Sequence, residues 1–224
     1  MIEPPLSPDE PLRLQSLRAT NQLDTPLEQR FERITRLAQR LLQAPIVAIS
    51  LIDADRQWFK SIQGLNVSET SRAISFCGHT ILQGEPMVVP DARQDPRFAD
   101  NPLVSGAPHI VFYAGCPIRA SDGTNIASLC IIDHQPRAMS HEDLQVLRDL
   151  ASLAESELAA GMQTAAQQEL MEQVDATKRQ AEIDPLIRIW NRASIFELLH
   201  AEVARAKRAG GGVGIIMADI DHFK

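Results

Sequence analysis

The stretch HIVFYAGCPIRASDGTNIASLCIID, residues 109–133, decides the fold that we expect for this chain. Two apolar, β-rich runs flank the connection RASDGT, and Asp122-Gly123 at its tip is a typical turn pair between antiparallel strands. A second hairpin is predicted upstream in PIVAISLIDADRQWFKSI, residues 45–62, where an Asp-Ala-Asp-Arg turn separates two apolar runs. Helical patterns lie before, between and after these hairpins, which indicates an α+β domain.

Apolar spacing, capping residues and Pro or Gly stops predict the other elements. They are helices over 12–22 and 27–43, a short helix from Ser75 to Gly84, a strand over 87–90, a long helix from the Ser140–Asp143 capping box to about Ala181, a helix after Asp184 that ends at the glycines from Gly210, and a final strand from Val213.

The composition limits the classes of function. With 22 basic and 29 acidic residues the net charge is −7, which disfavours nucleic acid or an anionic membrane surface as a partner. No apolar run approaches the roughly 20 residues of a membrane span, and the acidic, proline-rich N-terminus is unlike a signal peptide. An odd number of cysteines (Cys77, Cys116 and Cys130) forms no disulfide framework and fits a reducing compartment. We therefore expect a cytoplasmic protein.

The long helix carries apolar residues at 144, 147, 151, 154, 158 and 165, a spacing typical of a coiled-coil seam. Beyond residue 165 the helix is mostly polar and the apolar positions shift phase, so it would not be stable alone. We expect it to pair with a second copy, giving a homodimer through residues 144–181. The alternative, a helix packed on its own domain, fits residues 140–160 well and the rest poorly.

The end of the chain, VGIIMADIDHFK (213–224), is an apolar strand that opens into two aspartates and a lysine. Period two places Asp219 and Asp221 on one side of the strand. Carboxylates at a strand end suit a hard divalent cation such as Mg²⁺, with Lys224 nearby for phosphate oxygens. The alternative for this short pattern is a solvated strand end.

DPLIRIWNR (184–192), followed after one amphipathic helix by GIIMADIDHFK (214–224), resembles the opening of a GGDEF domain, the catalytic module of diguanylate cyclases. The resemblance implies that Asp219 and the main-chain carbonyl of Ile220 bind Mg²⁺. It also implies that Lys224, with the backbone amides of His222 and Phe223, contacts the nucleotide phosphates. Such domains join two GTP molecules, one held by each subunit of a dimer, into cyclic di-GMP.

Two positions depart from the family pattern DxLTGLxNR, because its threonine is Ile187 here and its glycine is Arg188. Both lie in the turn before the helix. The guanine-binding residues and the signature hairpin of that family would lie beyond Lys224. We therefore expect a domain truncated after its first strand and a chain that lacks cyclase activity alone.

Residues 23–160 resemble a GAF domain, through many motifs in order: LDTPLEQRFERITRLA, SLIDADRQWFK, SFCGHTI, PDARQDPRFADNPLV, FYAGCPI and SLCIID. The stretch VFYAGC lacks an arginine and a small residue that are usual there. The resemblance implies a central antiparallel sheet flanked by helices, with a ligand pocket on one face, acting as a sensory module. It implies this organisation: an N-terminal segment and helix (1–22), the GAF domain (23–160), a signalling helix (161–183) and the start of the GGDEF domain (184–224).

The side chains expected at the GAF pocket are Phe76, Cys77, His79, Asp91, Tyr113, Cys116 and Cys130. Cys77 and His79 share one helix turn, and Cys116 and Cys130 are expected close together across the second hairpin, so a zinc or redox cluster is one interpretation. The other treats the cysteines as small buried apolar groups and His79 as a hydrogen-bonded core histidine. A covalent bilin is not expected, because Gly78 separates Cys77 from His79.

Together these patterns predict a GAF sensor that regulates a diguanylate cyclase in bacterial second-messenger signalling, through a shift of the paired helix. Two alternatives stay open. One is a non-catalytic GAF dimer that senses a ligand or redox state and contacts a partner. The other is a GAF domain that is itself an enzyme, like the free methionine sulfoxide reductases, although their cysteine-rich loop pattern is absent. The GAF ligand is not specified by the sequence.

Overall fold

The computed structural model describes residues 1–184 and 188–216; within the long helix it leaves the side chains of 162–170, 172, 175, 176 and 178–181 undescribed. The chain divides into two compact units, Met1–Ala165 and Ala166–Lys224.

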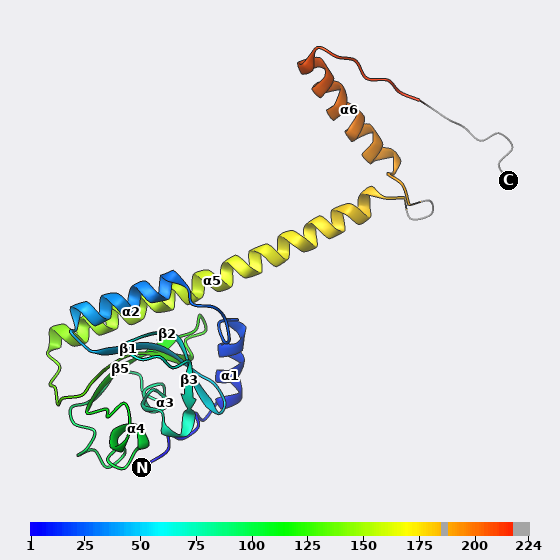
Figure 1. Cartoon of the computed structure of the whole chain (residues 1–224). Coiled ribbons are helices and arrows are strands. Elements are labelled where there is room, and N and C mark those ends of the chain that lie inside the picture. Colours follow the sequence, from blue (N-terminus) through cyan, green and yellow to red (C-terminus); the bar gives the residue numbers. More distant parts are fainter. Residues whose placement is uncertain (185–187, 217–224) are drawn as a thin grey trace. The chain divides into compact units, whose positions relative to one another are not determined.

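A six-stranded antiparallel sheet with the strand order β3-β2-β1-β6-β5-β4 forms the centre of the first unit (Figure 1). The strands are β1 (Ile46–Ile52), β2 (Arg56–Gln63), β3 (Glu69–Ser71), β4 (Met87–Val89), β5 (Phe112–Arg119) and β6 (Asn125–Asp133). Both predicted hairpins are confirmed, with Gly123 at φ +86° in the second turn. The outer strands β3 and β4 are only three residues long, which limits the exposed edge.

The helices are α1 (Glu10–Ala19), α2 (Gln29–Leu41), α3 (Phe76–Thr80), α4 (Pro102–Ser105), α5 (His141–Glu182) and α6 (Arg192–Ala209), with a 3₁₀ turn at Arg72–Ile74. The predicted caps are confirmed. Ser75 Oγ accepts from the Gly78 amide at 2.9 Å, and the Ser140 and Asp143 side chains accept from each other's amides at 3.2 and 3.0 Å. Helix α3 ends four residues before the predicted stop at Gly84.

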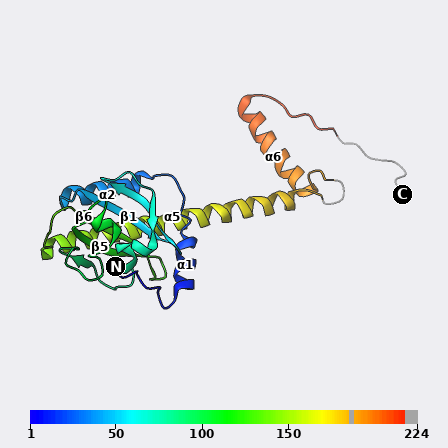
Figure 2. The same ribbon diagram turned by 60° about the horizontal axis from the view of Figure 1, so that its bottom comes forward.

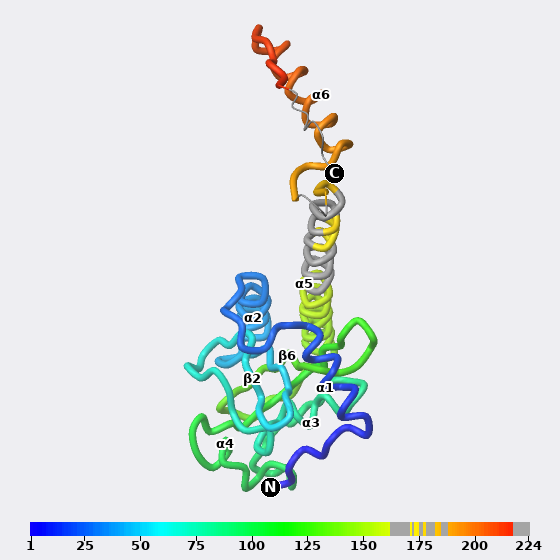
Figure 3. The backbone as a smooth tube through the Cα atoms, turned by 90° about the vertical axis from the view of Figure 1, so that its right-hand side faces the viewer, coloured from blue at the N-terminus to red at the C-terminus, as the bar shows by residue number. Residues whose placement is uncertain are grey.

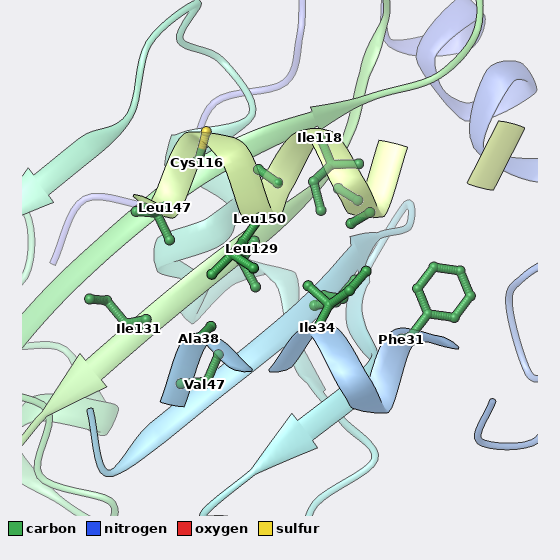
Figure 4. Close-up of a cluster of buried hydrophobic side chains, with 14 of the residues drawn as sticks. Phe31, Ile34, Ala38, Val47, Cys116, Ile118, Leu129, Ile131, Leu147 and Leu150 are labelled. Atoms are coloured by element: carbon green, nitrogen blue, oxygen red, sulfur yellow. The ribbon is translucent and has the colours of Figure 1, made fainter. Parts of the chain in front are cut away.

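The sheet has two buried faces, each with its own apolar core. On one face, α2 and α5 lie side by side (Figures 1 and 2). Figure 4 shows Ile34 and Ala38 of α2 and Leu147 of α5 beside Leu129 and Ile131 of β6. The opposite face is covered by α3, α4 and the loops around them, which form the second core. The pleat explains this division, since alternate side chains of a strand enter opposite cores.

Part of the predicted coiled-coil seam is used within the domain. Leu147, Ala151, Ala154 and Leu158 are buried against the sheet. These four residues pack on their own domain, as the alternative expected for residues 140–160, and the homodimer through residues 144–181 stays a prediction. Sheet burial satisfies the same three- and four-residue spacing that a partner helix would.

The N-terminal segment belongs to the first compact unit. Leu17 of α1 is fully buried in the core beneath α2 and α5. The Ile2 amide donates to the carbonyl of Arg97 at 3.0 Å, and the terminal amine pairs with Asp100. Figure 3 shows the N-terminus beside the loops near α4. Residues 1–22 are therefore part of the same folded unit as the sheet.

The second unit contains α6, and main-chain hydrogen bonds join Asp184 to Arg188 and Ile189 before it. The Asp184 amide donates to the Ile189 carbonyl at 2.8 Å, Asn191 Oδ1 caps α6 by accepting from the Ser194 amide at 3.0 Å, and Gly210 ends the helix at φ +71°. The predicted strand from Val213 is not found over residues 213–216, and its continuation lies outside the described residues. Within the described ranges, no helix combines the length and apolarity needed to cross a bilayer.

Candidate functional site

A cavity of about 210 Å³ lies on the sheet face that α3 and α4 cover. Its walls come from five of the six strands, from the loop after β2, from α3, and from α4 with the loop that follows it. The lining residues are Ile46, Ala48, Gln57, Phe59, Ile62, Leu65, Val67, Thr70, Phe76, Cys77, Leu103, Ala107, Pro108, Ile110, Tyr113, Cys130 and Ile132.

The chemistry of the lining suits an uncharged, largely apolar molecule, because no acidic or basic side chain is among these residues. Two polar side chains of the lining could orient such a molecule through hydrogen bonds. Gln57 accepts a short hydrogen bond from Ser75 Oγ through its side-chain oxygen. The hydroxyl of Thr70 is buried without a hydrogen-bond partner in the described part of the chain. A ligand group could therefore hydrogen-bond to it without breaking an existing hydrogen bond.

A cluster of buried polar side chains surrounds Cys77 at the wall of the cavity. Tyr113 Oη donates to Cys77 Sγ at 3.3 Å and lies 2.7 Å from Thr80 Oγ1. The Cys77 thiol donates to Ser50 Oγ at 3.5 Å, and Cys130 lines the same cavity. Elements far apart in sequence, β1, α3, β5 and β6, supply these groups.

This environment separates the acidities of the two thiols. Burial raises the pKa of Cys77, but the interactions with Cys130, Tyr113 and Ser50 outweigh it, so the pKa lies below the usual thiol range. The neighbouring Cys77 side chain, together with burial, raises the pKa of Cys130. Burial likewise raises the pKa of the Tyr113 hydroxyl. Cys77 is therefore the group that ionises first.

Of the seven side chains expected at the pocket, Phe76, Cys77, Tyr113 and Cys130 line the cavity. His79 shares α3 with Cys77 but does not line the cavity. Its Nε2 lies 3.1 Å from the carbonyl of Ile2, and its ring meets the edge of Phe98 at 5.1 Å between centroids. Burial lowers the pKa of His79, which favours the neutral ring in this structural role.

Asp91 and Cys116 are also outside the cavity. Asp91 forms a local ion pair with Arg93 at 2.7 Å, and the hydrogen bond from Arg93 lowers the pKa of Asp91 to about 2. Cys116 points to the opposite face of the sheet, near Leu147 and Leu150 of α5 (Figure 4), where burial raises the pKa of its thiol to about 11. The expected proximity of Cys116 and Cys130 is therefore wrong.

The residues expected to hold Mg²⁺ and nucleotide, Asp219, Ile220, His222, Phe223 and Lys224, lie outside the described residues. Within the described part, no three His, Cys, Asp or Glu side chains gather in a metal-binding group.

Sequence reasoning missed Ser50, Gln57, Thr70 and Thr80 as members of the site. Ser50 did leave a signal, because it is the single polar residue in the strand IVAISLI. A polar side chain inside such a run needs a buried hydrogen-bond partner. Thr70 left none, since β3 itself was not predicted.

Known proteins similar to this chain include a curated relative and two solved structures. A cyclic di-GMP phosphodiesterase of Pseudomonas aeruginosa is 40% identical over 154 residues, 68% of this chain, which spans only 26% of that relative's length. The GAF domain of a phosphoenolpyruvate-protein phosphotransferase from Coxiella burnetii has a TM-score of 0.51 at 20% identity, over 70% of this chain and 96% of that one. The free methionine-R-sulfoxide reductase of Neisseria meningitidis, solved with its substrate, has a TM-score of 0.50 at 17% identity, over 74% and 98%.

The two solved structures show a shared fold only, at these identities. The family itself is shown by a sequence model: residues 26–158 match the GAF domain, more than half of the 224 residues. The match spans α2, the whole six-stranded sheet and the part of α5 that packs on it. This chain belongs to the GAF domain family.

Proposed function

We propose that the first unit is a sensory domain that binds a small, largely apolar molecule in the cavity and so controls cyclic di-GMP turnover. One observation carries the proposal: the cavity and helix α5 lie on opposite faces of the same strands. Tyr113 and Cys130 line the cavity, whereas their neighbours Phe112, Leu129 and Ile131 pack in the core that contains α5.

A ligand that displaces the cavity side chains would therefore act on α5 through the strands. Close-packed cores transmit such displacements because they hold few voids that could absorb them. Occupancy of the cavity would bias α5 between two arrangements, as in other ligand-controlled domains. The link to cyclic di-GMP is supported by the 40% identity to the Pseudomonas aeruginosa phosphodiesterase.

Within this proposal, residues 184–224 begin a GGDEF domain that uses Mg²⁺ and GTP. Two features of the turn and helix support it. Arg188, which stands where the family has glycine, adopts φ +55°, a left-handed conformation that glycine favours. Helix α6 begins after its cap Asn191 and has no buried residue, with Phe196 and Leu198 each half exposed. An amphipathic helix of this kind packs on a further core.

We also keep the homodimer as a proposal, restricted to the part of α5 beyond Leu158. Met171 and Val174 are exposed in the single chain and are three residues apart, on one side of the helix. A parallel partner helix would cover them.

The test uses a matched pair of Leu→Trp variants. Leu103 lines the cavity, whereas Leu153 is exposed on α5, so Leu103→Trp fills the cavity and Leu153→Trp does not. Wild-type protein is screened by thermal shift against small apolar molecules, and cellular cyclic di-GMP is measured by mass spectrometry in strains carrying each allele. We expect ligand-induced stabilisation in wild type and Leu153→Trp, its loss in Leu103→Trp, and an altered cyclic di-GMP pool only in Leu103→Trp.

The two parts of the proposal fail separately. Equal ligand shifts in all three proteins would show that the cavity is not the binding site. Loss of ligand binding with an unchanged cyclic di-GMP pool would contradict the control of turnover and would favour a module that only contacts a partner.

A further inference from the structure

Two of the three cysteines line the cavity. Cys77 comes from α3 and Cys130 from the central strand β6, and both sulfur-bearing side chains line the cavity wall. Cys130 lies on β6, between β1, which carries Ser50, and β5, which carries Tyr113, and the hydroxyls of Ser50 and Tyr113 both contact the Cys77 sulfur. Both are free thiols in this structure, and each side chain is almost completely shielded from bulk solvent. Only a reagent that enters the cavity would meet them.

We propose that Cys77 and Cys130 form a reversible intramolecular disulfide when a hydroperoxide enters the cavity, which makes the cavity a thiol-oxidation site. The inference goes beyond the proposed function, because it requires neither an apolar ligand nor cyclic di-GMP. The cavity of about 210 Å³ has room for hydrogen peroxide. For comparison, one water molecule takes up about 30 Å³ in the liquid.

The chemistry proceeds in two balanced steps. The Cys77 thiolate attacks one oxygen of the hydroperoxide, the O–O bond breaks, and a proton converts the departing oxygen into water or an alcohol. Cys77 is then a sulfenic acid. The Cys130 sulfur attacks the Cys77 sulfur and the S–O bond breaks; the Cys130 proton leaves with the hydroxide as water. Two thiols are oxidised by two electrons in all, and the hydroperoxide is reduced by two.

The neighbouring groups assign the attacking role to Cys77. Tyr113 Oη donates to its sulfur at 3.3 Å, and the hydroxyl of Ser50 lies 3.5 Å away. Hydroxyl donors replace water around a buried thiolate and so favour its formation. The raised pKa of Cys130 keeps that thiol protonated until it resolves the sulfenic acid.

Cys116 provides an internal comparison. It lies on the other face of the sheet, in the apolar core beside α5, and burial raises its pKa to about 11. An inert thiol of this kind is not expected to react at neutral pH. Because Cys116 lies on the opposite face of the sheet from the cavity, Cys77 and Cys130 are expected to react with peroxide and Cys116 is not.

The experiment treats the full 224-residue chain with hydrogen peroxide at neutral pH, blocks free thiols with an alkylating reagent and maps cysteine-containing peptides by mass spectrometry. We expect one linked Cys77–Cys130 peptide pair, reversed by dithiothreitol, with Cys116 still alkylated. The linked pair should persist in Cys116→Ser and disappear in Cys77→Ser and Cys130→Ser.

The oxidation of the wild-type protein does not depend on whether any variant folds. This measurement by itself therefore tests whether the Cys77–Cys130 disulfide forms. A wild-type protein that keeps both cavity thiols after peroxide, or that loses Cys116 as fast as Cys77, would overturn the inference. Linked peptides between two chains, visible as a covalent dimer on a non-reducing gel, would overturn it as well.

Discussion

The hydroxyl of Tyr113 on β5 donates to the sulfur of Cys77 on α3 across 3.3 Å, in the interior of the domain. Tyr113 is the only tyrosine of the chain, and its ring also packs against Phe76 with centroids 5.1 Å apart. One side chain thus joins the central sheet to the helix that forms the cavity wall. A change at the Cys77 sulfur or at the Tyr113 phenol is therefore expected to affect both the sheet and α3.

Tyr113→Phe removes the hydrogen bond and keeps the ring. Without this donor the pKa of Cys77 rises relative to wild type, so its reaction with hydrogen peroxide at pH 7 should slow by about tenfold and the pH–rate profile should move to higher pH. The rate of Cys77 oxidation is followed by quenched alkylation and mass spectrometry.

The matched control is Thr80→Val, which removes the other partner of the Tyr113 hydroxyl, 2.7 Å away, but leaves Cys77 its donor. This variant should keep a wild-type rate and profile. Identical slowing in both variants would mean that loosened packing, and not the donor to Cys77, governs the rate.

Gly115→Ala is expected to destabilise the domain because a Cβ there would collide with the Tyr113 hydroxyl and approach Thr80 Oγ1. Overpacking of this kind costs about 1–3 kcal/mol. Gly84→Ala is the control, since nothing lies within 4 Å of a Cβ at that position. Urea unfolding measures both.

The double variant Gly115→Ala/Tyr113→Phe tests the cause. Removal of the colliding hydroxyl should return part of the lost stability, so the two changes should be less harmful together than their sum. Strict additivity would show that the Tyr113 hydroxyl is not the group whose collision with the new methyl group lowers the stability.

The cluster of Glu10, Arg13 and Arg72 predicts a loss of stability in acid. Burial raises the pKa of Glu10, but hydrogen bonds and charge from Arg13 at 2.5 Å and Arg72 at 2.6 Å outweigh it and lower that pKa to about 2. A carboxyl whose folded-state pKa lies below its ordinary value of 4.5 stabilises the fold above that pH. The contribution, about 3 kcal/mol, is lost as the pH falls from 4.5 towards 2.

The measurement compares wild type with Glu10→Gln by urea unfolding between pH 7 and pH 2.5. The difference in unfolding free energy should be large at pH 7 and should shrink below pH 4.5. Glu3→Gln, at an exposed position near the same segment, should match wild type throughout. A difference for Glu10→Gln that stays constant with pH would contradict the role of the charge.

Two substitutions separate the parts of α5. Leu158 is 1% exposed in the core of the first unit, so Leu158→Asp should lower the stability of that unit by about 3–5 kcal/mol. Val174 is 57% exposed, so Val174→Asp should leave the thermal midpoint of the first unit unchanged and, if the proposed dimer forms there, convert it to a monomer. Differential scanning fluorimetry and light scattering measure the two effects. A fully stable Leu158→Asp protein would contradict the packing of α5 on the sheet.

Local signals were enough to locate most elements. Asp122-Gly123 marks the second hairpin, and Ser75 and Ser140 cap the helices that follow them, because turns and caps depend on residues only a few positions apart. Strand β3 and the 3₁₀ turn after it were missed, because the polar segment ETSRAI carries no strand or helix period. Pairing with β2 gives that segment its structure.

The candidate site was predicted in part, and the errors have a structural cause. Residues directly opposite on paired strands share a face, and here Cys130 faces Gly115 while Cys116 faces Leu129. A register shift at Ile118/Arg119 lies between the turn and this pair. A shift of one residue exchanges the faces of a strand, so the sequence could not decide which cysteine enters the cavity.

The sequence by itself determined the family, the two hairpins, the caps and the apolar period of α5, since each depends on residues near one another in the chain. The tertiary structure decided that the period of α5 is satisfied by the sheet and not by a partner helix over Leu147–Leu158. It also decided that Cys77 meets Tyr113 and lines one cavity with Cys130, whereas Cys116 lies in the opposite core. The physical reason is that burial acts on both faces of one sheet at once, so strand register and helix docking together select which side chains meet.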